Sequence, residues 1–146
     1  MQARHLTFAL LLGLTFFLTA SNFNKGPFQL RIKACQSDQG KVMLALYNSA
    51  ASYMKIEKAF RKEMLTIKNG VARLNIQDLP YGEYAAVCFH DENENQKLDK
   101  NMMGIPKEGY GFSNNAKGSF GPPSFEKARF SHQSGQVQAD IQMVYW

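Results

Sequence analysis

Oxygen-bearing side chains recur at a regular spacing between residues 91 and 99, in the stretch DENENQKLD. The first, third, fifth and ninth positions of this stretch are Asp91, Asn93, Asn95 and Asp99. Calcium takes about six to eight oxygen ligands, and alternating Asp and Asn residues on a tight loop can direct several of them to one point. The spacing matches the start of an EF-hand-type loop, so it predicts a calcium site at these residues.

The loop departs from an EF-hand at two positions. Gln96 occupies the sixth position, where glycine normally makes the sharp turn, and Met102 occupies the twelfth, which is normally a bidentate glutamate. The missing glutamate argues against a helix–loop–helix EF-hand but leaves a shorter calcium loop open. We expect such a loop to bind calcium weakly, with Glu92 and Glu94 pointing outward. The other interpretation is a solvated acidic turn that ends a strand.

The second feature that could carry chemistry is a histidine beside carboxylates. His90, Asp91 and Glu108, with Ser113 nearby in the sequence, are the best candidates for general acid–base work in a hydrolytic enzyme. However, the sequence contains no nucleophile elbow, HExxH motif or glycine-rich phosphate loop. A hydrolase is therefore the alternative, and a non-enzymatic binding or structural module is the leading interpretation.

The two cysteines, Cys35 and Cys88, both fall in predicted strands. In an oxidising compartment such a pair often forms a disulfide, which would close a long loop and add a few kcal/mol of stability. Two buried free thiols are equally compatible with the sequence, because cysteine packs well as a small apolar side chain. A catalytic cysteine–histidine pair with His90 or His132 has no local support.

The segment from residue 103 to residue 125 combines glycines, prolines and asparagines with aromatic residues. It is too rich in glycine and proline for a long helix or a central strand, and too apolar for a disordered tail. One interpretation is a compact flap whose aromatic side chains cover one end of the fold. The other is a surface for a protein, peptide or glycan at the cell envelope, with candidate ligand-binding residues His90, Glu108, Tyr110, Phe112, Asn114 and Asn115.

Short strands must position these residues. Alternating or continuously apolar stretches at 28–35, 41–47, 83–90, 127–131 and 136–145 predict strands, and Asn69-Gly70 predicts a hairpin between 65–68 and 71–76. Only residues 52–64 have helical spacing; we expect one or two turns there, or a crossing loop that packs Phe60 inward. The pattern predicts an all-β fold, an antiparallel seven-stranded β-sandwich with one long irregular loop at 91–125.

The first 20 residues have the three parts of a secretory signal peptide: a charged start at Arg4, an apolar run and small residues at its end. The run is shorter than the roughly 20 residues of a membrane span. We expect cleavage after Ala20 or Ser21, with an uncleaved anchor as the alternative. No cysteine lies near this point to accept a lipid anchor. The mature chain, residues 21–146, is expected to be a single periplasmic or secreted domain without a stable membrane span.

The charge of the mature chain is mild. Removing the signal peptide removes one basic residue, Arg4, so the formal charge falls from +5 to +4. Lysines and arginines are scattered rather than gathered in a stripe, which argues against nucleic-acid binding. An accessory subunit that pairs through a sheet edge is a third class of function that the sequence leaves open.

The stretch from residue 79 to residue 130 resembles the signature of an exported bacterial family, the domain of unknown function 2141 family. The likeness is carried by the sequences HDEN at 90–93, KLD at 97–99, GIP at 104–106, EGYGFSNN at 108–115 and FGPP at 120–123. Gln96 departs from the pattern, since the family commonly has glycine there. The resemblance implies an exported β-sandwich similar to transthyretin-like and carboxypeptidase-regulatory-like domains, through the turn that contains Leu79, Pro80, Gly82 and Tyr84. It implies no established activity.

Overall fold

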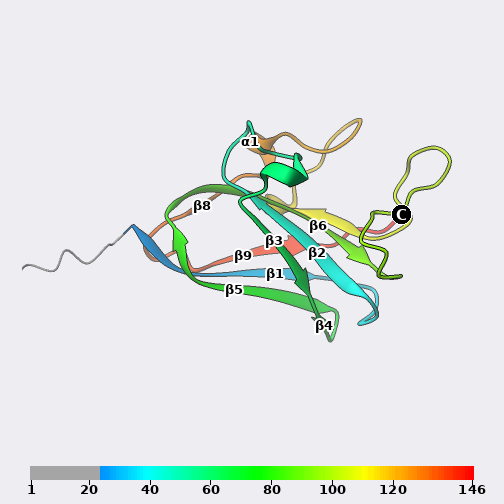
Figure 1. Ribbon diagram of the computed structural model, residues 1–146, viewed down its shortest axis with the longest axis horizontal. Coiled ribbons are helices and arrows are strands. Elements are labelled where there is room, and N and C mark those ends of the chain that lie inside the picture. Colours follow the sequence, from blue (N-terminus) through cyan, green and yellow to red (C-terminus); the bar gives the residue numbers. More distant parts are fainter. Residues whose placement is uncertain (1–23) are drawn as a thin grey trace, which may run out of the picture.

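The computed structural model describes residues 24–146, which form two β-sheets (Figure 1). The predicted signal peptide lies outside the described residues. One sheet has the strand order β4-β5-β1-β9, and the other has the order β3-β2-β6-β7, with β8 paired to the start of β6. The mainly β architecture in two sheets confirms the all-β class.

The four-stranded sheet is built on β1 (Lys25–Lys33). This strand pairs antiparallel with β5 (Val71–Pro80) and parallel with β9 (Gln138–Gln142), so the predicted antiparallel arrangement is wrong for this one pair of strands. The short strand β4 (Ile67–Lys68) joins β5 through a two-residue turn. Asn69 and Gly70 have φ angles of 52° and 71° in this turn. Both angles are positive, as a tight hairpin of this type requires, and the predicted hairpin is confirmed.

The second sheet is centred on β2 (Lys41–Tyr47) and β6 (Gly82–Asp91), which pair antiparallel along the whole length of β2. Next to β2 lies β3 (Arg61–Leu65), and next to β6 lies β7 (Tyr110–Phe112). The strand β8 (Phe130–His132) pairs with the first residues of β6. The end of β6 therefore carries His90 and Asp91 into the loop that follows.

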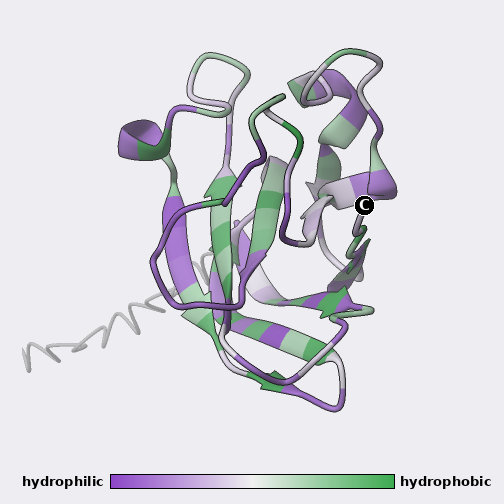
Figure 2. Ribbon diagram, turned by 90° about the vertical axis from the view of Figure 1, so that its right-hand side faces the viewer, coloured by the Kyte–Doolittle hydropathy of each residue, from purple (hydrophilic) through white to green (hydrophobic). Residues whose placement is uncertain are grey.

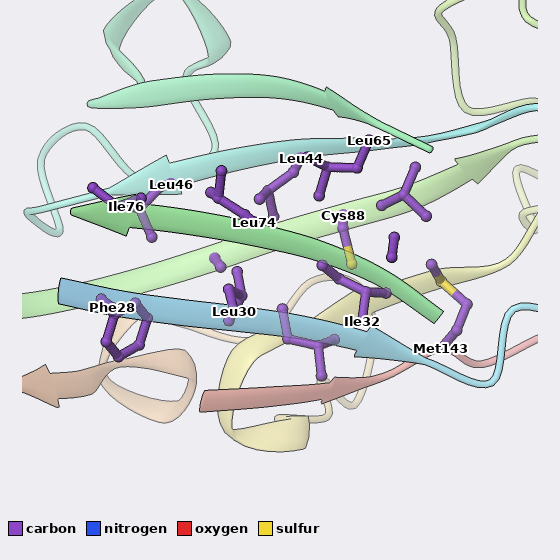
Figure 3. Packing of buried hydrophobic residues seen from close by; sticks show 14 of the residues in the cluster. Phe28, Leu30, Ile32, Leu44, Leu46, Leu65, Leu74, Ile76, Cys88 and Met143 are labelled. Atoms are coloured by element: carbon purple, nitrogen blue, oxygen red, sulfur yellow. The ribbon is translucent and has the colours of Figure 1, made fainter. Parts of the chain in front are cut away.

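The hydrophobic core fills the space between the sheets (Figure 3). Alternating residues of each strand point inward, as period-two patterning requires, and the apolar and polar bands along the strands are visible in Figure 2. Leu30 and Ile32 of β1 meet Leu44 and Leu46 of β2 in one cluster, and each is at most 4% exposed. Burying each such side chain is worth about 1.5–3 kcal/mol relative to exposure, so this cluster supplies most of the driving force for folding.

Helices are short. The 3-10 turn η1 (Ile56–Lys58) is the only helical part of residues 52–64, because residues 61–65 pair with β2 as strand β3. Phe60 remains 43% exposed, with its ring edge against Tyr84. The other helical pieces are η2 (Ser113–Asn115) and α1 (Phe125–Ala128). Between residues 24 and 146, none of these helices has the length and apolar character needed to cross a membrane.

Candidate functional site

Asp91 is the last residue of β6 and shapes the loop that follows it. Its side chain is buried, with only 1% of the residue exposed. One carboxylate oxygen accepts the backbone N–H of Asn95 at 3.0 Å, and the other accepts the backbone N–H of Gln96 at 2.8 Å. These two bonds fold residues 91–96 into a closed turn, which we call the acidic loop together with residues 97–99.

The other predicted metal ligands converge within the acidic loop. The Asn93 amide donates to the Asp99 carboxylate at 2.7 Å, and the Asn95 amide donates to its two oxygens at 3.1 and 3.2 Å. The side-chain oxygen of Asn95 accepts the backbone N–H of Lys97 at 2.8 Å. The three side chains of residues 93, 95 and 99 therefore meet at one point, whereas the Asp91 carboxylate bonds to the backbone of the loop.

Gln96 takes the backbone conformation that glycine would take at the sixth position of a calcium loop. Its φ angle is 61°, and that of Glu94 is 59°. This left-handed conformation costs a residue with a side chain about 1–2 kcal/mol. The sequence departure at Gln96 thus adds backbone strain, but it does not prevent the turn.

Glu108 joins the acidic loop from the segment before β7. It is 6% exposed, and its two carboxylate oxygens accept the backbone N–H groups of Glu92 and Asp99 at 3.1 and 2.9 Å. The backbone N–H of Lys107 also donates to the carbonyl of Asp99 at 2.8 Å. Sequence reasoning grouped Glu108 with the aromatic ligand-binding candidates, whereas the structure places it under the acidic loop. Nothing in the sequence except its charge links it to that loop.

The acidic loop and Glu108 beneath it gather five carboxylates, and among the described residues their one basic neighbour is the buried His90, whose Nδ1 lies 3.8 Å from Glu92. Across residues 24–146, no Lys or Arg forms an ion pair with any of these carboxylates. Two of them, Asp91 and Glu108, are buried. Buried charges are normally paired or bound to a metal ion, so the loop has an excess of negative charge. The carboxylates of the cluster are Asp91, Glu92, Glu94, Asp99 and Glu108.

A metal ion at this loop would need ligands other than acidic side chains. Among the described residues, no group of three His, Cys, Asp or Glu side chains is arranged to hold a metal ion. Calcium accepts amide and backbone carbonyl oxygens beside carboxylates, whereas zinc and similar metals prefer His and Cys. The acidic loop offers only oxygen donors, from two Asp and two Asn residues, which suits a hard cation such as calcium better than zinc.

His90 is fully buried, and both of its ring nitrogens have partners. Nε2 lies 2.7 Å from the carbonyl oxygen of Gln39, so this nitrogen carries a proton and donates it. Nδ1 lies 2.7 Å from the hydroxyl of Tyr145, whose pKa burial raises to about 12. In the neutral imidazole, Nδ1 accepts the Tyr145 proton. No nitrogen is left to exchange a proton with a substrate, so His90 joins three distant segments instead.

Ser113, the fourth residue of the hydrolase hypothesis, lies elsewhere in the core. It is completely buried, its hydroxyl donates to the carbonyl of Ala128 at 2.5 Å, and it accepts the backbone N–H of Ala86 at 2.8 Å. The hydroxyl connects η2 and α1 to β6. The structure does not bring Ser113 and His90 together as a nucleophile and base.

The remaining ligand-binding candidates divide into two groups. Tyr110 and Phe112 lie on β7 with their ring centres 6.0 Å apart, partly exposed on the outer face of the sheet. Asn114 donates its amide to the carbonyl of Lys127, and the Asn115 side chain accepts the backbone N–H of Gln142. Both asparagines have positive φ and hold neighbouring segments in place. Only the aromatic pair therefore faces a surface where a ligand can bind.

Cys35 and Cys88 are buried free thiols in the structure, one of the two alternatives that the sequence left open. Burial raises the pKa of Cys35 to about 11 and also raises the pKa of Cys88. The Cys88 thiol faces the carbonyl oxygen of Gly111 at 3.6 Å. Both thiols are neutral at physiological pH, so neither is an activated nucleophile.

A groove that sequence reasoning did not locate crosses the outer face of the five-stranded sheet. It consists of two adjoining hollows of about 600 and 420 Å³ that share Met54, Val87 and Phe89 in their walls. Tyr110 and Phe112 line the smaller hollow, so the predicted aromatic surface is part of this outer groove. The sequence KVMLALY at residues 41–47 gave one indication of this groove. Its strand is apolar on both faces, so one apolar face lies outside the core.

Comparison with known proteins gives one match. A family model described as "Uncharacterized protein conserved in bacteria (DUF2141)" matches residues 30–140. Searches of the curated proteins and of the solved structures give no match. The matched range begins within β1 and ends within β9, so it includes both sheets, the acidic loop and β7. The chain therefore belongs to the bacterial DUF2141 family.

Proposed function

We propose that the protein is an exported, non-enzymatic binding module whose acidic loop binds one calcium ion. The observation that carries the proposal is a pair of buried carboxylates, Asp91 in the acidic loop and Glu108 beneath it, neither of which forms an ion pair with a described residue. A bound divalent cation would offset this concentration of negative charge. Export to the periplasm or the outside of the cell fits, because calcium is available there.

The ligands would come from alternate residues of the loop. Asp91, Asn93, Asn95 and Asp99 would supply side-chain oxygens, and the carbonyl of Lys97, at the seventh position, would supply a backbone oxygen. Binding would require the amides of Asn93 and Asn95 to turn their oxygens toward the Asp99 carboxylate, which now accepts their N–H groups. Calcium sites of extracellular modules typically have dissociation constants of about 10⁻⁴–10⁻³ M.

Thermal unfolding tests the calcium site, because a ligand that binds only the native state raises the midpoint. At about 10 mM calcium, a site of this affinity adds about 1.4–2.7 kcal/mol and raises the midpoint by roughly 5–10 °C. Chelator should reverse the rise, and magnesium at the same concentration should give a smaller one. An unchanged midpoint at this calcium concentration would remove the site from the proposal.

A matched pair of variants distinguishes a specific site from general charge screening. Asp99→Asn and Glu94→Gln each remove one negative charge from the same loop. Asp99 meets both amides, whereas the exposed Glu94 makes no side-chain hydrogen bond to a described residue. The calcium-induced rise should disappear in Asp99→Asn and persist in Glu94→Gln. Equal loss in both variants would indicate screening instead.

We further propose that the sandwich is of the transthyretin-like kind and that its core has seven strands. Support comes from the turn between β5 and β6, where the Tyr84 hydroxyl donates to the carbonyl of Pro80 at 2.9 Å. Tyr84 is 3% exposed, so the bond fixes the corner between the two sheets. Hydrolysis is not proposed, because His90 has no free ring nitrogen and Ser113 lies apart from it.

A further inference from the structure

The floor of the outer groove is made of residues that point away from the core on four adjacent strands. The strand register places them in two rows across the sheet. The first row, from β3 to β7, is Met64, Met43, Phe89 and Tyr110. The second row is Lys62, Ala45, Val87 and Phe112. An open antiparallel sheet normally presents polar residues to water, so this apolar outer face is unusual.

Residues from the flanking loops form the walls of the outer groove. On one side stand Met54 and Ile56, which are 45% and 56% exposed, and on the other stand Leu98 and Ile105. Because neighbouring strands lie about 4.8 Å apart, the floor from β3 to β7 extends for about 14 Å. Trp146, 83% exposed, lines the far end and donates its indole N–H to the Tyr110 hydroxyl at 2.8 Å.

Among the side chains that line the outer groove, the charges without an ion pair are positive. Lys62 lines one hollow and Lys100 lines the other, and neither forms an ion pair within residues 24–146. The one acid in the lining, Glu63, is paired with Arg61 at 2.6 Å. The acidic loop adjoins the groove through the uncharged Gln96 and Leu98. Each hollow therefore has one unpaired cation beside its apolar lining, and this cation complements an anionic head group.

We propose that the outer groove binds a long-chain fatty acid, with the acyl chain along the apolar floor and the carboxylate at Lys62 or Lys100. This names a ligand for the proposed binding module and does not depend on calcium. The floor offers almost no hydrogen-bonding side chain, so a peptide or sugar lying on it would lose its bonds to water without replacement. An acyl chain has no such bonds to lose.

A second copy of the chain is the other apolar occupant to consider. A symmetric dimer would bring the same face of two molecules together, which places the unpaired lysines of both rims in one interface. Like charges in a buried interface cost free energy, whereas a carboxylate head group neutralises one of them. The charge pattern therefore favours the fatty acid over self-association.

The single tryptophan provides the measurement. Trp146 is the only tryptophan in the sequence, and it lines the outer groove. Titration with dodecanoate, kept below its micelle concentration, should give a saturable blue shift of its emission. Dodecanol should bind about fivefold more weakly, and dodecyltrimethylammonium, with a cationic head, should bind more weakly still. Equal binding of the three compounds, or no saturable shift, would overturn the proposal.

Variants separate the floor from the rim. Val87→Trp places a large ring at the centre of the floor, so we expect at least a tenfold loss of dodecanoate affinity. Val137→Trp, at an exposed site outside the groove, is the matched control and should leave affinity unchanged. Because each of these variants adds a second tryptophan, isothermal titration calorimetry measures their affinities. Replacing Lys62 and Lys100 with Gln together should weaken dodecanoate about fivefold and leave dodecanol unchanged.

Two further outcomes would each overturn the proposal. One is concentration-dependent dimerisation that dodecanoate does not reverse, since the face would then be a self-interface. The other is binding to anionic vesicles without binding to monomeric dodecanoate, since the ligand would then be a lipid surface. The titration is performed both with calcium and with chelator. Absence of dodecanoate binding then does not affect the test of the calcium site, and absence of calcium binding does not affect the test of the fatty-acid site.

Discussion

Asp91 acts first as a structural residue at the acidic loop, because its carboxylate accepts the backbone N–H groups of both Asn95 and Gln96. A carboxylate in this position lowers the cost of the left-handed conformation at Gln96 by holding the turn from inside. The same group is the first of the proposed calcium ligands. Replacement of Asp91 therefore affects folding and metal binding together, which is why Asp99 is the better residue for a test.

The state of the two thiols is a prediction at the same scale. In the native protein Cys35 and Cys88 are buried, and burial raises the pKa of both thiols, so we expect them to react with a thiol reagent only after unfolding. Counting reactive thiols in urea under non-reducing conditions should then give two per chain. A count of zero would show that the protein carries the Cys35–Cys88 disulfide instead.

Contacts within one loop were predictable from the sequence, whereas contacts between distant segments were not. The short spacing of Asn93, Asn95 and Asp99 places their side chains in contact within one loop, whereas the role of Asp91 as a backbone acceptor was not predicted. The partners of His90 were not predictable, because they come from Gln39 and Tyr145, far away in the sequence. Local patterns identify loops, whereas contacts between distant segments depend on how the sheets pack.

At the scale of elements, β7 shows why glycines flank its aromatic residues. An added Cβ at Gly111 would stand 2.6 Å from Cγ2 of Ile141 in β9, and one at Gly109 would stand 2.3 Å from the ring of Tyr145. Glycine at both positions lets the C-terminal segment lie directly against β7. Tyr110, between them, points outward into the groove.

We therefore predict that Gly111→Ala lowers the free energy of unfolding by about 1–3 kcal/mol, the usual cost of overpacking a core site. Urea denaturation measures it. In a background of Ile141→Ala the additional loss should be much smaller, because the side chain that meets the new Cβ is then shorter. An equal loss in the two backgrounds would mean that the contact with Ile141 is not the cause.

The strand β3 was missed in the sequence for a related reason. Ile56, Phe60 and Met64 follow a helical spacing, and three of the five residues in β3 are charged, which is weak support for a strand. In the structure Ile56 and Met64 line the outer groove. Their apolar side chains therefore belong to a surface and not to the buried face of a helix. Pairing with β2 overrides the local pattern, and this pairing is not visible in residues 52–64 alone.

At the scale of the whole molecule, the two ends of the described chain meet in one sheet. The strands β1 and β9 pair in parallel, with Gln29 beside Gln138 and Lys33 beside Gln142. Asp140 ties them together, since its carboxylate accepts two bonds from Arg31 at 2.7 and 2.8 Å and one from Lys33 at 2.5 Å.

This cluster predicts a pH-dependent contribution to stability. Mainly through the Arg31 hydrogen bond, the pKa of Asp140 falls from its ordinary 3.8 to about 2. Ionised Asp140 therefore stabilises the fold above pH 3.8, and the contribution is lost as the pH falls from 3.8 toward 2. Because the groups are about a third exposed, we expect Asp140→Asn to cost under about 1 kcal/mol at pH 7 and only a small fraction of that near pH 2.

Urea denaturation of both proteins at pH 7 and pH 2 measures the difference. Asp78→Asn is the control, because Asp78 forms one ion pair with Lys25 and both side chains are at least half exposed. It should change stability little at either pH. A cost of Asp140→Asn that is the same at both pH values would contradict the assignment.

The parallel pairing of β1 with β9 also sets a time order for folding. The four-stranded sheet is incomplete until residues 138–142 pair with β1, and the paired residues Arg31 and Asp140 are 109 positions apart in the sequence. Contacts between such distant residues form slowly, because a long chain must first be closed into a loop. Closure of the four-stranded sheet by β9 is therefore expected to be a late step of folding. For the export proposed above, such a late step would keep the chain unfolded during its passage across the membrane.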